Sequence, residues 1–276
     1  MKKYGLFLLV LAVSVFFFIR GSKEEAPSKS LFRIGVECDY APNNWEAQKP
    51  SEFSFPIANH EGFFADGYDL QIARLVAGEL DVTLEVRKVA WNDLIPALLR
   101  GEIDAIFSGM LDTDERKKQV SFSEPYEVQK TEYAVVVNTE SPYAGAKSMT
   151  DFGGAKFTGQ KDTKLYSTIS QLPGAIALPP VDTVPEMLDA VTSMKVDAIV
   201  INLDTGRSYE ATYDNLRVVR FPENHGFVLG FNGICAGVRK NDTKLLNGIN
   251  GVLEKTRRSD RQKIMDNTVA RLWKNL

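Results

Sequence analysis

The chain has 276 residues, of which 44% are hydrophobic and 25% are charged, so it can bury one or two hydrophobic cores. Its formal net charge is −3, and it becomes −6 without the three basic residues of the first 20. An acidic body of this kind argues against nucleic acid or an anionic membrane surface as a partner. Two cysteines and two histidines without clustering argue against a zinc site, and we predict no metal, no cofactor and no catalytic residues.

The N-terminus has the pattern of an export signal. Met1-Lys-Lys precedes an apolar run from Leu6 to Ile19, which is shorter than the roughly 20 residues that cross a membrane. The segment that follows, 16–22, offers neither a small-x-small cleavage site nor a cysteine for lipidation. We therefore predict export, with residues 1–21 as a signal peptide or a retained anchor and residues 22–30 as a tether.

From Leu31 onward, predicted strands alternate with predicted helices. The first strands are expected over 31–37, 82–86 and 104–107, and the first helices from Asp69, as its N-cap, and over 92–100. Such alternation predicts a parallel α/β sheet with helices on both faces and ligands at the carboxyl ends of its strands. The segments after these strands, 36–46, 90–92 and 107–116, should therefore converge on one cleft.

The stretch 104–120 contains a candidate anion site. A buried strand is followed by the small polar turn 108–112, and Thr113 is a suitable N-cap for the next helix. Backbone N–H groups at such a helix start favour an anion, and Arg116 in its first turn could bind a carboxylate bidentately. The alternative is a surface turn followed by a solvated, charged helix.

A second alternation follows the strand predicted over 132–138. Strands are expected over 156–160, around Ile176, and over 197–201 and 216–221, and helices from Thr163 and over 184–194, 242–255 and 259–272. Two β-rich stretches, 132–138 and 226–237, bracket this block and are predicted to be hinge strands. The expected architecture is two lobes, with residues 31–133 and 231–276 in the first and residues 134–230 in the second.

Several segments carry a family resemblance. They are Arg33-Ile-Gly-Val-Glu-Cys-Asp-Tyr-Ala-Pro42, Gly67-Tyr-Asp-Leu-Gln-Ile-Ala73, Trp91-Asn-Asp-Leu-Ile-Pro-Ala-Leu98, Gly101-Glu-Ile-Asp-Ala-Ile106, Ser108-Gly-Met with Asp114-Glu-Arg-Lys-Lys118, and Phe122-Ser-Glu-Pro-Tyr126. From about residue 31 to its end, the chain resembles the polar amino-acid-binding proteins of ABC importers, the family 3 extracellular solute-binding proteins. The resemblance implies a two-lobe fold of the periplasmic-binding-protein type.

The resemblance also implies a set of ligand-binding residues. Arg116 would bind the ligand α-carboxylate, assisted by the turn at Ser108, by backbone groups of Gly109 and Leu111, and by Asp162 and Thr163 from the second lobe. The remaining matches are Tyr40 and Trp91, which would enclose the ligand side chain, and Glu37, which would recognise that side chain. The alternatives are ordinary loop packing for the two aromatic residues and an exposed, solvated carboxylate for Glu37.

The sequence departs from the family pattern most importantly at Asn202. The family usually has an acid there to pair with the ligand amine, and in this chain the nearest acid is Asp204. Either Asp204 supplies the charge through a shifted loop, or the protein binds more weakly or binds a different ligand. Lys161 and Met194 stand at positions where glycine is usual.

The expected function is extracytoplasmic capture of a polar amino acid, by a monomer that passes it to a membrane permease and its ATPase. Glu37 favours arginine or lysine over glutamine and should repel acidic amino acids. One alternative is a dehydratase on the same fold, with Glu37 or Asp204 as general acid or base. Another is a sensory binding protein that presents its ligand state to a membrane receptor.

Overall fold

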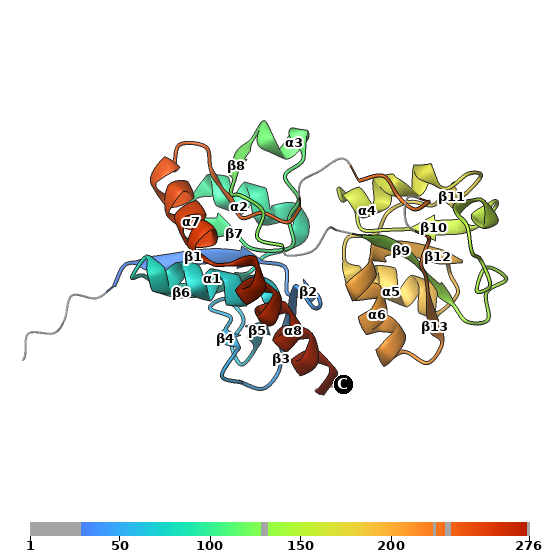
Figure 1. Cartoon of the computed structure of the whole chain (residues 1–276), viewed down its shortest axis with the longest axis horizontal. Helices are drawn as coiled ribbons and strands as arrows, with labels where there is room; N and C mark the ends of the chain where they lie inside the picture. The colour runs from blue at the N-terminus through green and yellow to red at the C-terminus, as the bar shows by residue number, and fades with distance from the viewer. Residues whose placement is uncertain (1–28, 128–131, 223–224, 230–232, 275–276) are drawn as a thin grey trace, which may run out of the picture.

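The computed structural model describes residues 29–127, 132–222, 225–229 and 233–274. The described strands form two five-stranded sheets and one four-stranded sheet, and the two larger sheets lie in separate lobes (Figure 1). We call the lobe that contains both ends of the described chain lobe 1, and the lobe built on residues 133–219 lobe 2. This two-lobe α/β architecture confirms the fold predicted from the sequence.

The larger sheet of lobe 1 has the strand order β6-β1-β7-β14-β8. Its members are β1 (Leu31–Val36), β6 (Thr83–Lys88), β7 (Ala105–Ile106), β8 (Val120–Phe122) and β14 (Gly237–Arg239). The first three in chain order are parallel, but β14 is antiparallel to both β7 and β8. The sheet is therefore mixed rather than all-parallel, because the chain that returns from lobe 2 enters it in the opposite direction.

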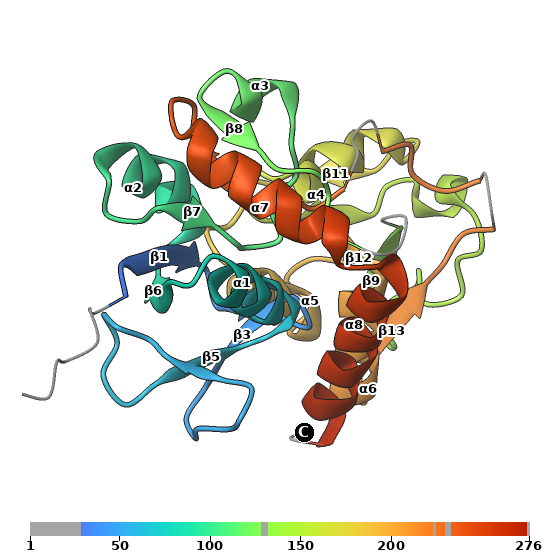
Figure 2. The ribbon, with the colours of Figure 1, turned by 60° about the vertical axis from the view of Figure 1, so that its left-hand side comes forward.

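Helices cover both faces of this sheet, as predicted (Figure 2). The helical elements are α1 (Tyr68–Glu79), η1 (Trp91–Asp93), α2 (Leu94–Arg100), α3 (Asp114–Lys117), α7 (Thr243–Lys255) and α8 (Arg258–Lys274). Apolar side chains of α1, α7 and α8 pack with Ile34 and Phe107 on one face, and those of α2 pack with Ile106 on the other. Each face is thus buried against its own helices, as in other α/β folds.

The start of α1 differs from the prediction. Gly67 precedes the helix with φ 138°, which allows the N–H groups of Tyr68 and Asp69 to donate to the carbonyl oxygens of the preceding loop, Pro42 and Asn43. Because the loop already accepts from the first N–H groups, no side-chain cap forms and Asp69 is fully buried instead. Its carboxylate accepts hydrogen bonds from Tyr126 Oη at 2.6 Å and from Asn44 Nδ2 at 2.8 Å.

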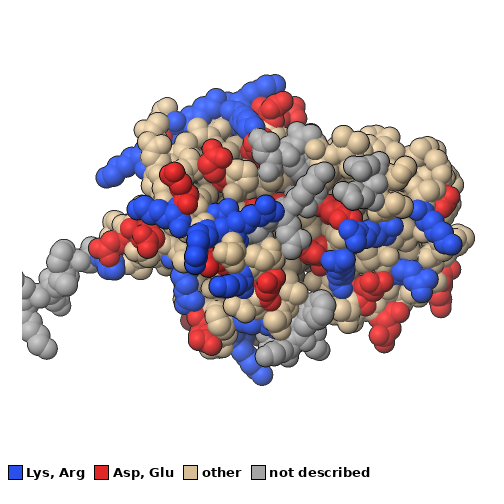
Figure 3. All heavy atoms as spheres, in the orientation of Figure 1, with Lys and Arg blue, Asp and Glu red and all other residues tan. Residues whose placement is uncertain are grey.

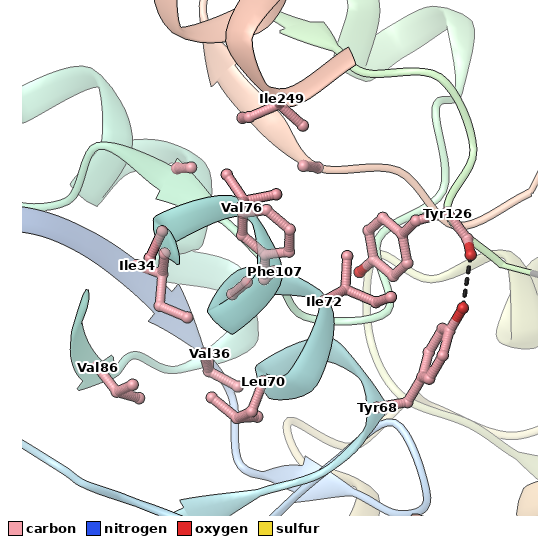
Figure 4. Close-up of a cluster of buried hydrophobic side chains, with 14 of the residues drawn as sticks. Ile34, Val36, Tyr68, Leu70, Ile72, Val76, Val86, Phe107, Tyr126 and Ile249 are labelled. Carbon is pink, nitrogen blue, oxygen red and sulfur yellow. Dashed lines mark hydrogen bonds between the residues drawn. The ribbon is translucent and has the colours of Figure 1, made fainter. Parts of the chain in front are cut away.

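Tyr126 also ties α1 to the chain that leaves lobe 1. The hydroxyl of Tyr68 donates to the Tyr126 carbonyl oxygen at 2.6 Å, beside the core formed by Ile72 and Val76 (Figure 4). The start of α1 therefore holds the last described part of the chain before it crosses to lobe 2.

A small sheet in lobe 1 was not predicted. It has the order β2-β3-β5-β4, with β2 (Asp39–Tyr40), β3 (Asn44–Ala47), β4 (Phe55–Pro56) and β5 (Phe64–Asp66), and its pairs are antiparallel. It occupies the chain between β1 and α1. Its strands are short, so the sequence offered little alternation from which to predict them.

The sheet of lobe 2 has the order β11-β10-β12-β9-β13. Its strands are β9 (Tyr133–Asn138), β10 (Lys156–Thr158), β11 (Ile176–Ala177), β12 (Ala198–Asn202) and β13 (Leu216–Val219). Its helical elements are η2 (Met149–Phe152), α4 (Lys164–Ser167), η3 (Thr168–Gln171), α5 (Val184–Thr192) and α6 (Leu203–Thr212), of which α6 was not predicted.

The predicted hinge strand over 132–138 is β9, whose six residues are all buried in the lobe 2 sheet. The second predicted hinge strand, 226–237, lies partly outside the described residues, at 230–232. Its described residues form no strand before β14 begins at Gly237. Among the residues that are described, no helix combines the length and the apolar character that crossing a membrane requires.

Candidate functional site

A cleft between the lobes brings together the predicted site residues except Asp162 and Asp204. The predicted residues that line it are Glu37, Tyr40, Trp91, Ser108, Gly109, Leu111, Arg116, Thr163 and Asn202. Asp162 lines a wider outer recess that shares Trp91, Arg116 and Thr163 with the cleft. The sequence-based prediction that loops after several strands converge is thereby confirmed.

Arg116 is a half-buried cation held by neutral groups. Thr113 caps α3, with its hydroxyl accepting from the Arg116 N–H at 3.3 Å, as predicted. The Arg116 guanidinium donates to the Leu111 carbonyl oxygen at 2.9 Å and, across the cleft, to the Asp162 carbonyl oxygen at 3.0 Å. Burial lowers the pKa of Arg116 to about 10. It forms no ion pair with any described carboxylate, so its charge is available to an anionic ligand group.

The two predicted aromatic residues, Trp91 and Tyr40, contact different parts of the cleft. The Trp91 ring covers the Arg116 guanidinium, whose central carbon lies 4.9 Å from the ring centre. Tyr40 packs against lobe 2 and against Gly109, where an added Cβ would lie 3.0 Å from Tyr40 Cδ1. Because Gly109 also has φ 61°, this turn accepts a larger side chain only with strain.

Glu37 is buried, so the alternative of a solvated carboxylate is wrong. It follows β1 and is 3% exposed, and its backbone N–H donates to Ser108 Oγ at 2.9 Å. Its carboxylate accepts a hydrogen bond from Gln160 Nε2, which belongs to lobe 2 and also donates to the Asp182 carbonyl oxygen at 3.3 Å. Burial raises the pKa of Glu37 to about 7, against the opposing effect of the Gln160 hydrogen bond.

Thr163 starts α4 at the lobe 2 side of the cleft. Its hydroxyl donates to the Gln160 carbonyl oxygen at 2.6 Å and accepts from the Tyr166 N–H at 3.3 Å. It is preceded by Asp162, which has a left-handed φ of 56°. The turn thus presents the Asp162 carbonyl oxygen to Arg116 while Thr163 fixes the helix start.

Asn202 lines the cleft, whereas Asp204 does not. Asn202 ends β12 and caps α6, with its Oδ1 accepting from the Asp204 N–H at 2.9 Å. The Asp204 side chain is 37% exposed and pairs with Arg207 at 3.4 Å. Because the helix begins directly after Asn202, it directs the Asp204 carboxylate toward Arg207, and the shifted-loop alternative for the ligand amine is not supported.

Five residues that line the cleft were not predicted: Tyr133, Gln160, Lys164, Leu165 and Ile234. Gln160 could have been found, because it follows a parallel strand at the same sheet edge as the predicted groups. Tyr133 begins an antiparallel strand, so that rule does not reach it.

Cysteine and metal chemistry are not indicated at this cleft. Cys38 and Cys235 are free and buried, and burial raises the pKa of the Cys235 thiol to about 12. Within the described part of the chain, no group of three or more metal-ligating side chains is brought together.

Comparisons with known proteins give a consistent picture. The family described as bacterial extracellular solute-binding proteins, family 3, matches residues 32–268. A probable histidine-binding protein of Campylobacter jejuni is 26% identical over 76% of each chain. The arginine-binding extracellular protein ArtP of Bacillus subtilis is 26% identical over 81% of this chain and 82% of its own length. Among solved structures, the ancestral amino acid-binding protein AncCDT-1, a precursor of cyclohexadienyl dehydratase, is 27% identical with a TM-score of 0.68, covering 86% of this chain and 95% of its own.

Proposed function

Since the chain belongs to family 3 of the bacterial extracellular solute-binding proteins, we propose that it captures a basic amino acid and delivers it to the permease and ATPase of an ABC importer. Arg116 carries this proposal. It is a half-buried guanidinium between the two lobes, it has only neutral partners among the described residues, and its planar fork matches a ligand carboxylate.

The ligand would lie along the cleft from Arg116 toward Glu37. Its α-carboxylate would pair with Arg116 beside Leu111 and Thr163. Its α-amine would lie near Asn202, whose Oδ1 already accepts one hydrogen bond and offers less than a carboxylate would. Its side chain would point past Tyr40 toward Glu37.

Glu37 supports a basic side chain over other classes. A guanidinium or ammonium would bring a positive charge to a buried carboxylate, whereas an acidic side chain would be repelled in a dry cleft. Arginine fits better than lysine, because a planar guanidinium can also lie against aromatic rings. Glutamine remains the strongest neutral competitor, since its amide can form a hydrogen bond with Glu37.

Capture would proceed by hinge closure of a monomer. The moving lobes would be residues 31–133 with 231–276 and residues 134–230. Among the described residues, hydrogen bonds from Arg116 to Asp162 and from Gln160 to Glu37 join the lobes at the cleft. A ligand held by Arg116 and Glu37 would therefore touch both points of closure.

Isothermal titration calorimetry against the standard amino acids tests the proposal. We expect arginine or lysine to bind most tightly, glutamine more weakly, and glutamate and aspartate not at all. A protein that binds none of them would contradict the proposal, and preferential binding of glutamate would contradict the placement of Glu37 beside the ligand side chain.

A dehydratase is the second candidate, because a buried carboxylate with a pKa raised to about 7 suits proton transfer near neutral pH. Against it, Glu37 is the one carboxylate among the described residues that line the cleft. We therefore propose binding without turnover. Incubation with arginine and with hydroxy-acid substrates, followed by mass spectrometry, should return each compound unchanged.

The protein would act outside the cytoplasm, tethered to the membrane by residues 1–21 if they are retained. Charges of both signs are interspersed over the face seen in Figure 3, with no extended surface of one sign. N-terminal sequencing of the cellular protein should find Met1 in a membrane fraction. A soluble exported form that begins near Ser22 would contradict the tether.

A further inference from the structure

Glu37 is a carboxylate enclosed between the lobes without a cation of its own. Its hydrogen-bond partner across the cleft, the Gln160 amide, is neutral, and no described basic group lies within ion-pair distance of it. Lys88, a basic side chain that acts electrostatically on Glu37, pairs instead with Glu46 at 3.0 Å and with Asp39 at 3.6 Å. A carboxylate enclosed by neutral groups becomes protonated at a higher pH than a solvated carboxylate.

The charged groups that act on Glu37 have opposing effects on its pKa. Asp39 in β2 disfavours its negative charge and Lys88 in β6 favours it. Tyr209 in α6 and Cys38 also face it, and burial raises the pKa of both groups, which keeps them neutral. Burial is the largest influence on Glu37, and it raises the pKa of this carboxyl to about 7 when the cleft holds no ligand.

We propose that Glu37 is ionised when the closed cleft holds a cationic side chain and protonated when it holds a neutral one, so that the choice between the two ligand classes depends on pH. This inference rests on the proposed function. A guanidinium or ammonium beside Glu37 stabilises the carboxylate. With glutamine in the cleft, the protonated carboxyl can instead donate its O–H to the ligand amide oxygen.

The direction of the effect follows from proton linkage. The arginine complex holds fewer protons than the glutamine complex, so raising the pH favours arginine over glutamine. The ratio of the two affinities should rise about tenfold per pH unit below the pKa of Glu37 in the glutamine complex and become constant above it. In the ligand-free cleft that pKa is raised to about 7. Because the two ligand complexes are compared with each other, the result does not depend on how open the ligand-free protein is.

Calorimetry with arginine, and with glutamine displacing arginine, should be performed from about pH 5.5 to 8.5 in two buffers of different ionisation enthalpy. We expect the rising ratio described above and, near pH 6, close to one more proton bound in the glutamine complex than in the arginine complex. A constant ratio with equal proton counts, or the absence of glutamine binding at every pH, would overturn the inference while leaving amino-acid capture intact. If neither ligand binds, the proposed function itself fails.

Three variants separate Glu37 from its neighbours. Glu37→Gln should abolish the slope. Asp39→Asn, the matched control, should keep the slope and move its midpoint to lower pH, because Asp39 raises the pKa of Glu37. Gln160→Leu should move the midpoint to higher pH, because the Gln160 hydrogen bond lowers that pKa. If Glu37→Gln does not fold, the other two variants still test the inference, because they should shift the midpoint pH of the affinity ratio in opposite directions. Midpoints that do not move would refute the role of Glu37.

Discussion

The two lobes meet at the cleft with different chemistry. Lobe 1 contributes the buried carboxylate of Glu37 and the half-buried guanidinium of Arg116, both from segments that follow strands of one sheet. Lobe 2 meets them mainly with neutral groups: the Asp162 carbonyl oxygen, the Gln160 amide and the turn at Thr163. Lys164, the charged side chain of lobe 2 that lines the cleft among the described residues, is exposed.

This division explains how closure can be reversible. Removing a charge from water costs several kcal/mol unless the charge is paired, and in this protein lobe 1 alone bears most of that cost. Lobe 2 adds hydrogen bonds of neutral groups, each worth about 1 kcal/mol net, so the closed state is only modestly favoured until a ligand arrives. A ligand that pairs both charges of lobe 1 would then shift the equilibrium.

Replacement of the lobe 1 cation should have the largest effect. Arg116→Ala should weaken binding of arginine by about 2–5 kcal/mol, because the ligand carboxylate would be buried without its partner. The matched control is Lys118→Ala, an exposed basic residue that follows the same helix, which should bind normally. Calorimetry measures both, and equal dissociation constants would end the role of Arg116 as carboxylate anchor.

The second largest effect should come from disrupting the buried hydrogen-bond network of lobe 1. Asp69→Ala should lower the free energy of unfolding by about 1–3 kcal/mol for each unpaired partner, Tyr126 and Asn44. It should also weaken ligand binding, because the Gly109 backbone of the cleft interacts favourably with the Asp69 carboxylate.

A buried polar residue of lobe 2 provides the control for Asp69→Ala. Asn138 is similarly buried, and its amide donates to the Thr192 carbonyl oxygen at 3.0 Å, away from the cleft. Asn138→Ala should reduce stability in urea titrations and leave affinity unchanged. Equal losses of affinity in the two variants would show that the lobes do not differ in this respect.

A smaller effect is expected at the lobe 2 turn. Thr163→Ala should cost about 1 kcal/mol of stability, because α4 loses its N-cap, and should weaken ligand binding less than tenfold. Thr163→Ser keeps the hydroxyl and should restore both quantities. A loss comparable to that of Arg116→Ala would mean that lobe 2 supplies as much binding energy as lobe 1.

The smallest change should be in overall shape. Small-angle scattering with and without a ligand shown to bind should give a slightly lower radius of gyration for the complex, because closure draws the lobes together. The ligand-free Arg116→Ala and wild-type proteins serve as references. An identical radius for free and bound protein would indicate lobes that do not close.

Much of this architecture could be predicted because its signals are local. The strands before Glu37 and Ser108 are short apolar runs, and Thr113 is a strong N-cap ahead of charged residues. The alternation of strands and helices implies that the carboxyl ends of the parallel strands share one edge of the sheet. Trp91 and Arg116 follow such strands, so their place in the cleft could be predicted.

What escaped prediction depends on distant partners or on weak patterns. Helix α6 carries few apolar residues and contains Gly206, so its sequence does not favour a helix, and it forms by packing on the lobe 2 sheet. Asp69 resembles a cap, and its burial depends on Tyr126, 57 residues away. The contact of Glu37 with Gln160 spans 123 residues and two lobes, which no local pattern encodes.

The position of β14 has a consequence for the order in which the two lobes can fold. This strand, Gly237–Arg239, lies between β7 and β8 and is bonded to both, although more than a hundred residues separate it from them in the sequence. A chain that emerges from its N-terminus has every strand of lobe 2 before it has the strand that completes lobe 1. Until then β7 and β8 have exposed edges, and the Arg116 turn between them is unsupported. The lobe that holds Glu37 and Arg116 is therefore the last to form, and a truncated or stalled chain would have a folded lobe 2 without a working site.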